Sequence, residues 1–490
     1  MENSNLSLPR HGRSRVDVLQ EMKRLRADDL NWQEGKVFSL VFFGGEEAHD
    51  FIRDAHNLFF SENALNPTAF PSLRRFETDV VRMSASLLGG DEQVAGNMTS
   101  GGTESILMTV LTAREWAKAH KPTVQKPEMI LPVTGHPAFE KAAHYFGLKV
   151  VHTPVGADFR ADVAAMATAV TPNTILLVAS APAYPHGMVD PVSDIAALAQ
   201  KHSILCHVDA CVGGFMLPFV RQLGYPVPTF DFQVPGVTSI SADLHKYGYA
   251  AKGASVILYR SRELRRHQLF AYTDWPGGIY ASPTMAGTRP GGTIAAAWAI
   301  MQYLGEEGYL QIARQVMETA VAIRSGIAQI PHIHVLGDPP ASVMALASDS
   351  LDIYEVGDEM GLRGWHLDRQ HYPPSLHLTL NYAHVQQADA FLADLAAAVT
   401  AVRKPNLRRF GNRILLGAAR TATRLLPKPL VSRLTAKAST VLGLGGGGLP
   451  ERSAAMYGMM GSLPNRGDLQ EVVLDLVESF TTPQEPQQRG

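Results

Sequence analysis

Short apolar runs alternate with helical stretches through the middle of the chain. The runs are Met129–Val133, Lys149–Val151, Thr174–Ala179, Ile204–Val208, Val237–Ser241 and Ser255–Leu258. Helical stretches separate several of them, for instance Ala138–Phe146 and Val192–His202. Continuous apolar strands separated by helices are typical of a parallel sheet that helices cover on both faces. The pattern predicts an α/β fold with a mostly parallel sheet, whose ligand site lies beyond the carboxyl ends of the strands.

Different patterns flank this middle part. Residues 1–70 are irregular apart from a short charged helix at Val16–Arg26, which predicts an N-terminal arm. The next helix has one apolar face, formed by Leu73, Phe76, Val80, Met83 and Leu87. From about Gln311, a long helix, short apolar segments and a helix at Gln386–Val402 predict a smaller α+β domain. We therefore expect an arm over 1–70, a large ligand-binding domain over 71–310 and a small C-terminal domain over 311–490.

The composition narrows the class of protein. At 490 residues, with 46% hydrophobic and 18% charged residues, the chain resembles an ordinary globular protein. A net charge of −2 gives it no general attraction to nucleic acid. Its two cysteines, Cys206 and Cys211, exclude a disulfide framework and favour a reducing compartment. Because the N-terminus is polar and no apolar run reaches the roughly 18–20 residues of a spanning helix, we expect a cytoplasmic protein without signal peptide or transmembrane segment.

One segment departs from this balance of charge. Residues 403–437 contain many Arg and Lys residues, interleaved with apolar residues, and no Asp or Glu. A basic amphipathic helix of this kind indicates peripheral contact with a membrane surface. Pro427 and Pro429 interrupt any long helix, so a solvated helix or a disordered insertion before the glycines at 445–448 is an equal alternative. We therefore treat 403–450 as a basic, glycine-rich insertion and leave membrane contact through 403–440 open.

Three short motifs carry candidate chemistry. Ser100–Thr103, with its two glycines, opens a helix, and the free N–H groups of such a helix start can bind phosphate. Asp209 directly follows one apolar run, and Lys246 follows the next in the sequence Asp243-Leu244-His245-Lys246. Each motif alone also has a plain structural explanation, as a helix cap, a turn aspartate or a surface lysine.

Taken together, the motifs indicate an enzyme that carries pyridoxal 5′-phosphate. In such enzymes an aspartate, here Asp209, pairs with the protonated pyridine nitrogen. Lys246 lies in a Gly- and Tyr-rich loop, and a half-buried aromatic pocket lowers the pKa of an amine, as a Schiff-base nucleophile requires. His136 follows a run at the same sheet edge, where it could stack on a planar cofactor or simply occupy a turn. The sequence has neither the spacing of a metal site nor the G-x-S-x-G elbow of a serine hydrolase.

Longer segments resemble the pyridoxal-dependent group II decarboxylase family, of fold type I. They are TSGGTESILM (99–108), HPAFEKAAHYFG (136–147), PHGMVDPV (185–192), HVDACVGGF (207–215), GVTSISADLHKYGYAAKGAS (236–255), TDWPGGIYASPTMAGTRPGG (273–292) and YPPSLH (372–377). The resemblance covers about residues 58 to 382, with a weaker one at AAMYGM (454–459). The ADLHKYG block marks the family, and TDWPGGIYASP with GTRPGG is similar to its branch of carbon–carbon lyases.

Position by position, the resemblance implies roles for these residues. Lys246 would bear the cofactor as a Schiff base, Asp209 would pair with the ring nitrogen, and His136 would stack on the ring. The cofactor would be held further by Ser100, Gly101, Gly102, Thr103 and His245, with Ser241 and Asp243 at the edge of the site. Lys252 and Tyr280 match positions near the substrate. The candidate proton carriers are Tyr280, Lys246 and His245.

The resemblance also implies an activity and an assembly. The lyase branch cleaves the C2–C3 bond of phosphorylated sphingoid bases by retro-aldol chemistry, giving a long-chain aldehyde and ethanolamine phosphate. An amino-acid decarboxylase is the leading alternative, and a catalytically inactive protein that binds the cofactor is another. Sites of fold type I lie between two subunits, so a homodimer is implied, with Gly287–Gly292 reaching the partner's site. The lyase pattern NPLHP reads NALNP here, and Asn66 keeps a hydrogen-bond donor for the substrate phosphate but loses the positive charge of a histidine.

Overall fold

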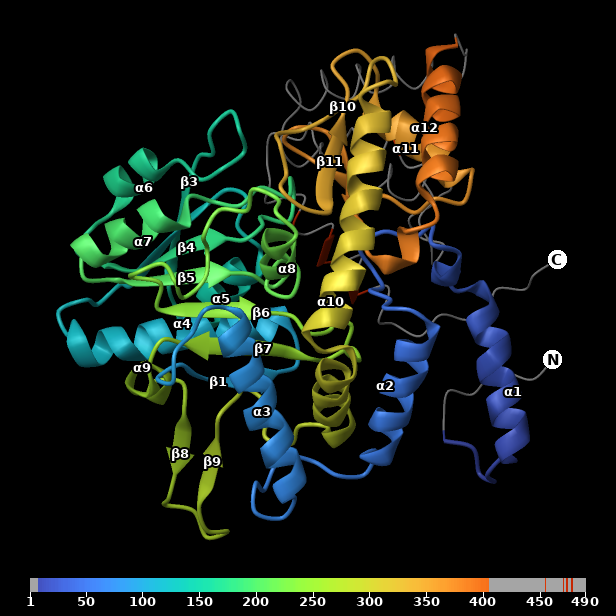
Figure 1. Cartoon of the computed structure of the whole chain (residues 1–490). Coiled ribbons are helices and arrows are strands. Elements are labelled where there is room, and N and C mark those ends of the chain that lie inside the picture. The colour runs from blue at the N-terminus through green and yellow to red at the C-terminus, as the bar shows by residue number, and fades with distance from the viewer. Residues whose placement is uncertain (1–7, 405–453, 455–469, 471–472, 475–476, 479–490) are drawn as a thin grey trace, which may run out of the picture. The chain divides into compact units, whose positions relative to one another are not determined.

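The computed structural model describes residues 8–404 and, beyond them, 454, 470, 473, 474, 477 and 478 (Figure 1). The chain forms two compact units, each discontinuous in sequence. One comprises Phe38–Ala347 and His377–Leu392, and the other comprises Met1–Val37, Ser348–Leu376 and Ala393–Gly490. The predicted parts, 1–70, 71–310 and 311–490, are continuous segments, and their boundaries stay a prediction. The basic insertion lies outside the described residues, apart from Arg403 and Lys404.

A seven-stranded sheet forms the core of the first unit (Figure 1). In chain order its strands are β1 (Ala95–Thr99), β2 (Glu128–Pro132), β3 (Lys149–Thr153), β4 (Thr174–Ser180), β5 (Leu205–Asp209), β6 (Ser239–Ala242) and β7 (Ser255–Tyr259). In space the order is β1-β7-β6-β5-β4-β2-β3. Only the two pairs that β7 makes, with β1 and β6, are antiparallel. The predicted fold class, an α/β fold with a mostly parallel sheet, is confirmed.

Five of the six apolar runs became strands that are covered on both faces, and the sixth became β3, a partly exposed strand at the edge of the sheet. Every residue of β2, β4, β5, β6 and β7 is buried. Strand β1 was not predicted, because its sequence AGNMT contains no apolar run. Strand β7 is antiparallel because residues 243–254, which connect it to β6, form no helix, and a parallel return requires a long crossover connection.

Helices connect and cover these strands. They are α2 (Glu46–Leu58), α3 (Pro71–Leu87), α4 (Gly102–His120), α5 (Ala138–Phe146), α6 (Val163–Ala169), α7 (Val192–Lys201), α8 (Leu217–Gln222), α9 (Arg262–Arg266) and α10 (Gly291–Ile327). Phe139 of α5 packs in one apolar cluster with Ile106 of α4 and Leu176 of β4. Helix α10 begins at Gly291, before the helix predicted from Gln311, and non-helical backbone at Gly305 divides it into two helical parts, of which the second contains Gln311.

Smaller elements complete the first unit. An antiparallel hairpin of β8 (Phe270–Tyr272) and β9 (Tyr280–Ser282) projects away from the sheet (Figure 1). The hairpin was not predicted, because most of its side chains are exposed and give no apolar run. The strands β10 (His334–Val335) and β11 (Val343–Ala347) pair antiparallel. Further along the chain, the short helix η3 (Tyr382–His384) belongs to this unit, whereas β13 (Ser375–Thr379) and α12 (Ala388–Arg403) extend across its boundaries at His377 and Leu392.

The second unit is mostly helical where it is described. It contains α1 (Arg15–Leu25), the short helices η1 (Arg26–Asp28) and η2 (Trp32–Glu34), α11 (Ile353–Gly361) and β12 (Asp368–Gln370). Helix α1 confirms the charged helix predicted in the N-terminal arm. Arg369 of β12 pairs with Asp358 of α11 at 2.7 Å. Among the helices described in either unit, none is both long and apolar enough to cross a membrane.

Candidate active site

Residues at the carboxyl ends of the strands meet at one cavity. Ser180 ends β4, Asp209 ends β5, and Asp243 directly follows β6. The cavity has a volume of about 360 Å³ and lies within the first unit. Of the predicted site residues, its lining contains Ser100, Gly101, Gly102, Thr103, His136, Asp209, Asp243, His245 and Lys246. The tertiary structure therefore brings together the three motifs, the first of which lies more than a hundred residues before the second.

Lys246 and Asp243 form an ion pair in the wall of this cavity. Lys246 Nζ lies 2.8 Å from Asp243 Oδ2, and the aspartate side chain is 2% exposed. Burial alone would raise the pKa of Asp243, but the charge of Lys246 holds it below its ordinary value. Burial likewise disfavours the charge on Lys246, yet the Asp243 carboxylate raises the pKa of Lys246 above its ordinary value. The predicted lowering of the Lys246 pKa is therefore wrong, because the pocket supplies a buried counter-ion.

Asp209 is held in place by polar groups of the sheet. Its Oδ1 atom accepts the Cys211 N–H at 3.1 Å and the Ser241 hydroxyl at 3.4 Å. Ser241, predicted at the edge of the site, is fully buried, is absent from the lining of the cavity and contacts Asp209. His207 lies 3.2 Å from the same hydroxyl, and burial lowers the pKa of His207 to about 4. The imidazole is thus neutral near pH 7 and belongs to the buried polar interior of the sheet.

The loop between β1 and α4 forms a cradle for an anion, defined here as Ser100–Thr103. Gly101 has a φ of +152°, which few residues other than glycine adopt. A Cβ atom on Gly102 would lie 2.8 Å from Cys211 Sγ and 2.9 Å from both carboxylate oxygens of Asp243. His245 Nδ1 is buried and has no hydrogen-bond partner within the described part of the chain. An open helix start beside an unsatisfied imidazole nitrogen fits a phosphate group.

Comparison with known proteins identifies the family. The pyridoxal-dependent decarboxylase conserved domain matches residues 1–345. The sphingosine-1-phosphate lyase of Arabidopsis thaliana is 43% identical over 472 residues, which cover 95% of this chain and 79% of that protein. The solved structure of a sphingosine-1-phosphate lyase from Burkholderia pseudomallei has a TM-score of 0.79 at 40% identity, covering 84% of this chain and 96% of that chain.

This chain belongs to the sphingosine-1-phosphate lyase family. The glutamate decarboxylase of Lactobacillus brevis, with a TM-score of 0.72 at 18% identity over 83% of this chain and 97% of that one, shares the fold. The predicted family, fold type and cofactor are thereby confirmed. The cavity fits that cofactor, since it offers an amine at Lys246, a carboxylate at Asp209 and the anion cradle in one lining.

A methyl group at Gly102 is expected to fill the cradle. Overpacking of this kind costs about 1–3 kcal/mol, so Gly102→Ala should weaken binding of pyridoxal 5′-phosphate by roughly 10- to 100-fold. Titration of the apoprotein, followed by absorbance, measures the change. The matched control is Gly361→Ala, since a Cβ there meets nothing within 4 Å. Equal affinities of the two variants would contradict the placement of the phosphate at this lyase-family cradle.

His136 lines the cavity and is exposed. Its Nδ1 atom accepts the N–H of Ala138, the first residue of α5, at 3.1 Å. That hydrogen bond fixes the ring beside the cavity. The geometry therefore agrees with both interpretations of His136. The residue occupies a turn, and its ring lies where the planar ring of a cofactor could stack on it.

The three predicted substrate residues do not line this cavity. Lys252 Nζ lies 3.5 Å from the His245 carbonyl oxygen and 5.5 Å from the centre of the Phe42 ring. Although its side chain reaches solvent, desolvation by its surroundings and the charge of Lys246 lower the pKa of Lys252. Asn66 is exposed, and its Oδ1 atom accepts from Thr68 N at 2.9 Å and Thr68 Oγ1 at 2.7 Å. Tyr280, in the projecting hairpin, is 38% exposed.

Several residues of the cavity wall were not predicted from the sequence. They are Ser180, Pro182, Tyr184, Val212, Glu104 and Ile106. Tyr184 follows β4 and packs against His377 with ring centres 4.0 Å apart. A signal was present in the sequence, since this segment follows an apolar run at the same sheet edge as Asp209. Cys211 is also buried and lines the cavity.

Proposed function

We propose that this protein cleaves the C2–C3 bond of phosphorylated sphingoid bases by retro-aldol chemistry, releasing a long-chain aldehyde and ethanolamine phosphate. The observation that carries the proposal is the meeting of Lys246, Asp209 and the anion cradle at one cavity. Support comes from the sphingosine-1-phosphate lyases, of which the Arabidopsis protein is 43% identical over 95% of this chain. The same cavity would also serve a decarboxylase, so the reaction requires its own test.

The residues around the cavity have separate tasks in this proposal. When bound, pyridoxal 5′-phosphate supplies an electron sink for the pair left on C2 as the bond breaks. Lys246 attaches the cofactor through its amine, and Asp209 keeps a proton on the ring nitrogen. The cradle and His245 hold the phosphate, and His136 presents a flat face to the ring. Asp243 keeps Lys246 in place through the 2.8 Å contact.

The reaction also requires proton transfers. One proton leaves the 3-hydroxyl group as the C2–C3 bond breaks, and another reaches C2 afterwards. Lys246 and His245 line the cavity, whereas Tyr280 of the same chain does not. Burial lowers the pKa of His245 against the opposing effect of Asp243, which leaves the imidazole neutral and able to accept a proton. We therefore assign the proton transfers in the chain's own cavity to Lys246 and His245.

The proposal includes a homodimer with shared active sites. Tyr280 and Asn66 match substrate positions in sequence but lie outside the cavity that their own chain forms. This arrangement supports a site in which the partner's cavity is completed by Tyr280, Asn66 and the segment Gly287–Gly292. Lys252 would contact the substrate near Lys246 of its own chain.

We also propose a cytoplasmic location with peripheral membrane contact through 403–440, which would suit a substrate with a lipid tail. The support for the membrane contact is the basic composition of that segment alone.

Product analysis tests the reaction. The holoenzyme is incubated in parallel with a phosphorylated sphingoid base and with aromatic and acidic amino acids. We expect a long-chain aldehyde and ethanolamine phosphate from the first, and no carbon dioxide from the others. Carbon dioxide without aldehyde would favour the decarboxylase alternative. Bound cofactor without any turnover would favour an inactive binding protein.

A further inference from the structure

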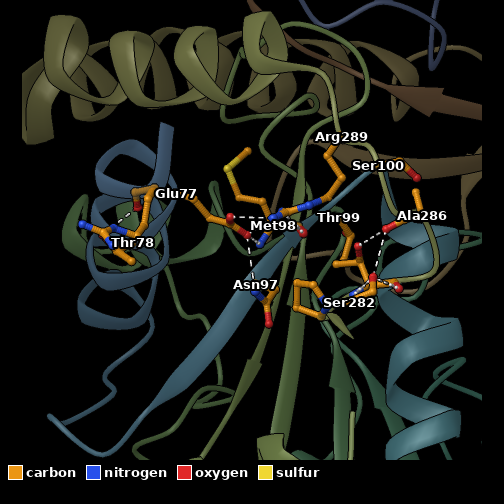
Figure 2. Close-up of polar contacts among 12 residues, drawn as sticks. Glu77, Thr78, Asn97, Met98, Thr99, Ser100, Ser282, Ala286 and Arg289 are labelled. Carbon is orange, nitrogen blue, oxygen red and sulfur yellow. Dashed lines mark hydrogen bonds and ion pairs between the residues drawn. The ribbon is translucent and has the colours of Figure 1, made fainter. Parts of the chain in front are cut away.

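A short connecting segment lies between the projecting hairpin and α10. We call Ser282–Gly291 the strap. Its first part is held in shape by its own side chains, because the Ser282 hydroxyl lies 2.9 Å from the Thr284 carbonyl oxygen and 3.1 Å from that of Ala286 (Figure 2). The Thr284 hydroxyl donates to the same Ala286 carbonyl at 3.0 Å. Both hydroxyl-bearing residues are buried, so the strap has a defined conformation at this end.

One carboxylate joins this strap to the anion cradle. Glu104 Oε2 accepts the Ser100 N–H at 2.6 Å, and Glu104 Oε1 accepts the Met285 N–H at 2.9 Å. Glu104 is 7% exposed and lines the cavity beside the cradle. Its two oxygens are thus divided between two chain segments that are nearly two hundred residues apart in sequence. A charged acceptor makes a stronger hydrogen bond than a neutral one. Replacing Glu104 by a neutral residue therefore removes a strong acceptor from each of the two N–H groups.

The far end of the strap is fastened to a different part of the first unit. Arg289 makes a two-fold ion pair with Glu77 of α3, at 2.6 and 2.8 Å, and lies 3.4 Å from the Met98 carbonyl oxygen of β1 (Figure 2). The Ala64 N–H donates to the Arg289 carbonyl at 2.9 Å. Asn66 follows two residues later. The strap therefore connects the cradle, through Glu104, with the loop that carries a predicted substrate residue.

We propose that Glu104 is a positioning residue that couples cofactor binding at the cradle to the order of the strap. A phosphate in the cradle fixes the loop at Ser100, and Glu104 transmits that restraint to Met285. This proposal rests on the proposed function only for the identity of the cofactor. A glutamine at this position could accept one N–H but would turn an amide NH₂ group toward the other, so one of the two links is lost.

Two measurements test the coupling, and neither uses turnover. The first is the dissociation constant of pyridoxal 5′-phosphate, followed by absorbance in the apoprotein. We expect Glu104→Gln to weaken binding by about tenfold or more, the effect of losing one charge-assisted hydrogen bond. The second is amide hydrogen exchange of a peptide covering the strap. In the unchanged protein the cofactor should slow this exchange, and in Glu104→Gln it should not.

Glu128→Gln is the matched control. Glu128 is also a buried carboxylate with two partners, Thr171 Oγ1 at 2.6 Å and Lys149 Nζ at 2.9 Å, and it does not line the cavity. The Glu128→Gln variant should be less stable than the unchanged protein, but it should keep the affinity for the cofactor and the slower hydrogen exchange of the strap when the cofactor is bound. Glu104→Asp is the second test variant, to be used if Glu104→Gln folds poorly. Aspartate keeps the negative charge but is too short to reach both amides, so this variant should also lose the response of the strap to the cofactor.

The outcomes are distinct. Loss of the strap's response in the Glu104 variants, with retention in Glu128→Gln, supports the coupling. An unchanged response in the Glu104 variants, or an equal loss in the control, overturns it. A protein that shows the coupling but releases no aldehyde from a phosphorylated sphingoid base would contradict the proposed function and leave the role of Glu104 standing.

Discussion

Replacing Lys246 by alanine is expected to remove both the long-wavelength absorbance of the bound cofactor and all measurable turnover. The variant has no amine at the carboxyl end of the sheet where Lys246 Nζ meets Asp243. Because attachment and proton transfer are lost together, turnover should fall by at least about 10⁴-fold, the upper range for a single acid–base group. Absorbance spectra with added pyridoxal 5′-phosphate and aldehyde release measure the two effects.

Lys246→Arg separates the chemistry of the amine from its charge. Arginine retains a positive charge next to the buried Asp243 carboxylate, whereas alanine leaves that carboxylate without its nearest counter-ion. We expect Lys246→Arg to lose absorbance and turnover as alanine does, but to keep more thermal stability. An alanine variant that still turns over substrate would refute the role of Lys246. Lys201→Ala, at the exposed end of α7, should leave all three properties unchanged.

The second large effect is expected at Asp209. In the unchanged protein Asp209 accepts the Cys211 N–H at 3.1 Å. Asp209→Asn keeps an oxygen for this N–H but removes the negative charge at the end of β5. Without that charge the ring nitrogen loses its proton and the cofactor becomes a poor electron sink. We expect turnover to fall by about 10³-fold, similar to the loss of one preorganised electrostatic contact in other enzymes.

Cofactor attachment distinguishes this outcome from misfolding. Since Lys246 and the cradle are untouched, Asp209→Asn should still take up pyridoxal 5′-phosphate and keep an absorbance band, with kcat reduced and little change in KM. Ser241→Ala provides the weaker companion variant, because it removes only the hydroxyl that donates to Asp209 at 3.4 Å. If Asp209→Asn turned over substrate at the unchanged rate, the assignment of this carboxylate to the ring nitrogen would be wrong.

Most of the central sheet could be predicted because burial of β2 and of β4 to β7 on both faces leaves a direct mark on the sequence. Strands β2 to β7 appear as apolar runs, and helices such as α5 have the predicted bounds. Strand β1 and the hairpin of β8 and β9 could not be predicted in the same way. β1 forms through its pairing with β7, and the hairpin carries mostly exposed side chains, so neither depends on a continuous apolar run.

The residue types of the candidate site were also visible in the sequence, but their mutual arrangement was not. Asp209 and Lys246 follow apolar runs, and that pattern is enough to place them at one sheet edge. The ion pair of Lys246 with Asp243 reverses the expected direction of the lysine pKa, since it depends on a distance of 2.8 Å that no spacing encodes. Tyr184 and Glu104 reach the cavity from a loop and a helix start whose direction only packing decides.

The sequence by itself therefore determined the fold class and the cofactor, and it supplied the residues that we propose for the cofactor site. Apolar periodicity and motif order are local properties, and they can be read without knowledge of contacts. Only the tertiary structure decided which groups touch: that Glu104 divides its two oxygens between the cradle and the strap, and that Asn66 and Tyr280 lie away from their own chain's cavity. These are contacts between distant segments, and they follow from the packing of the whole unit.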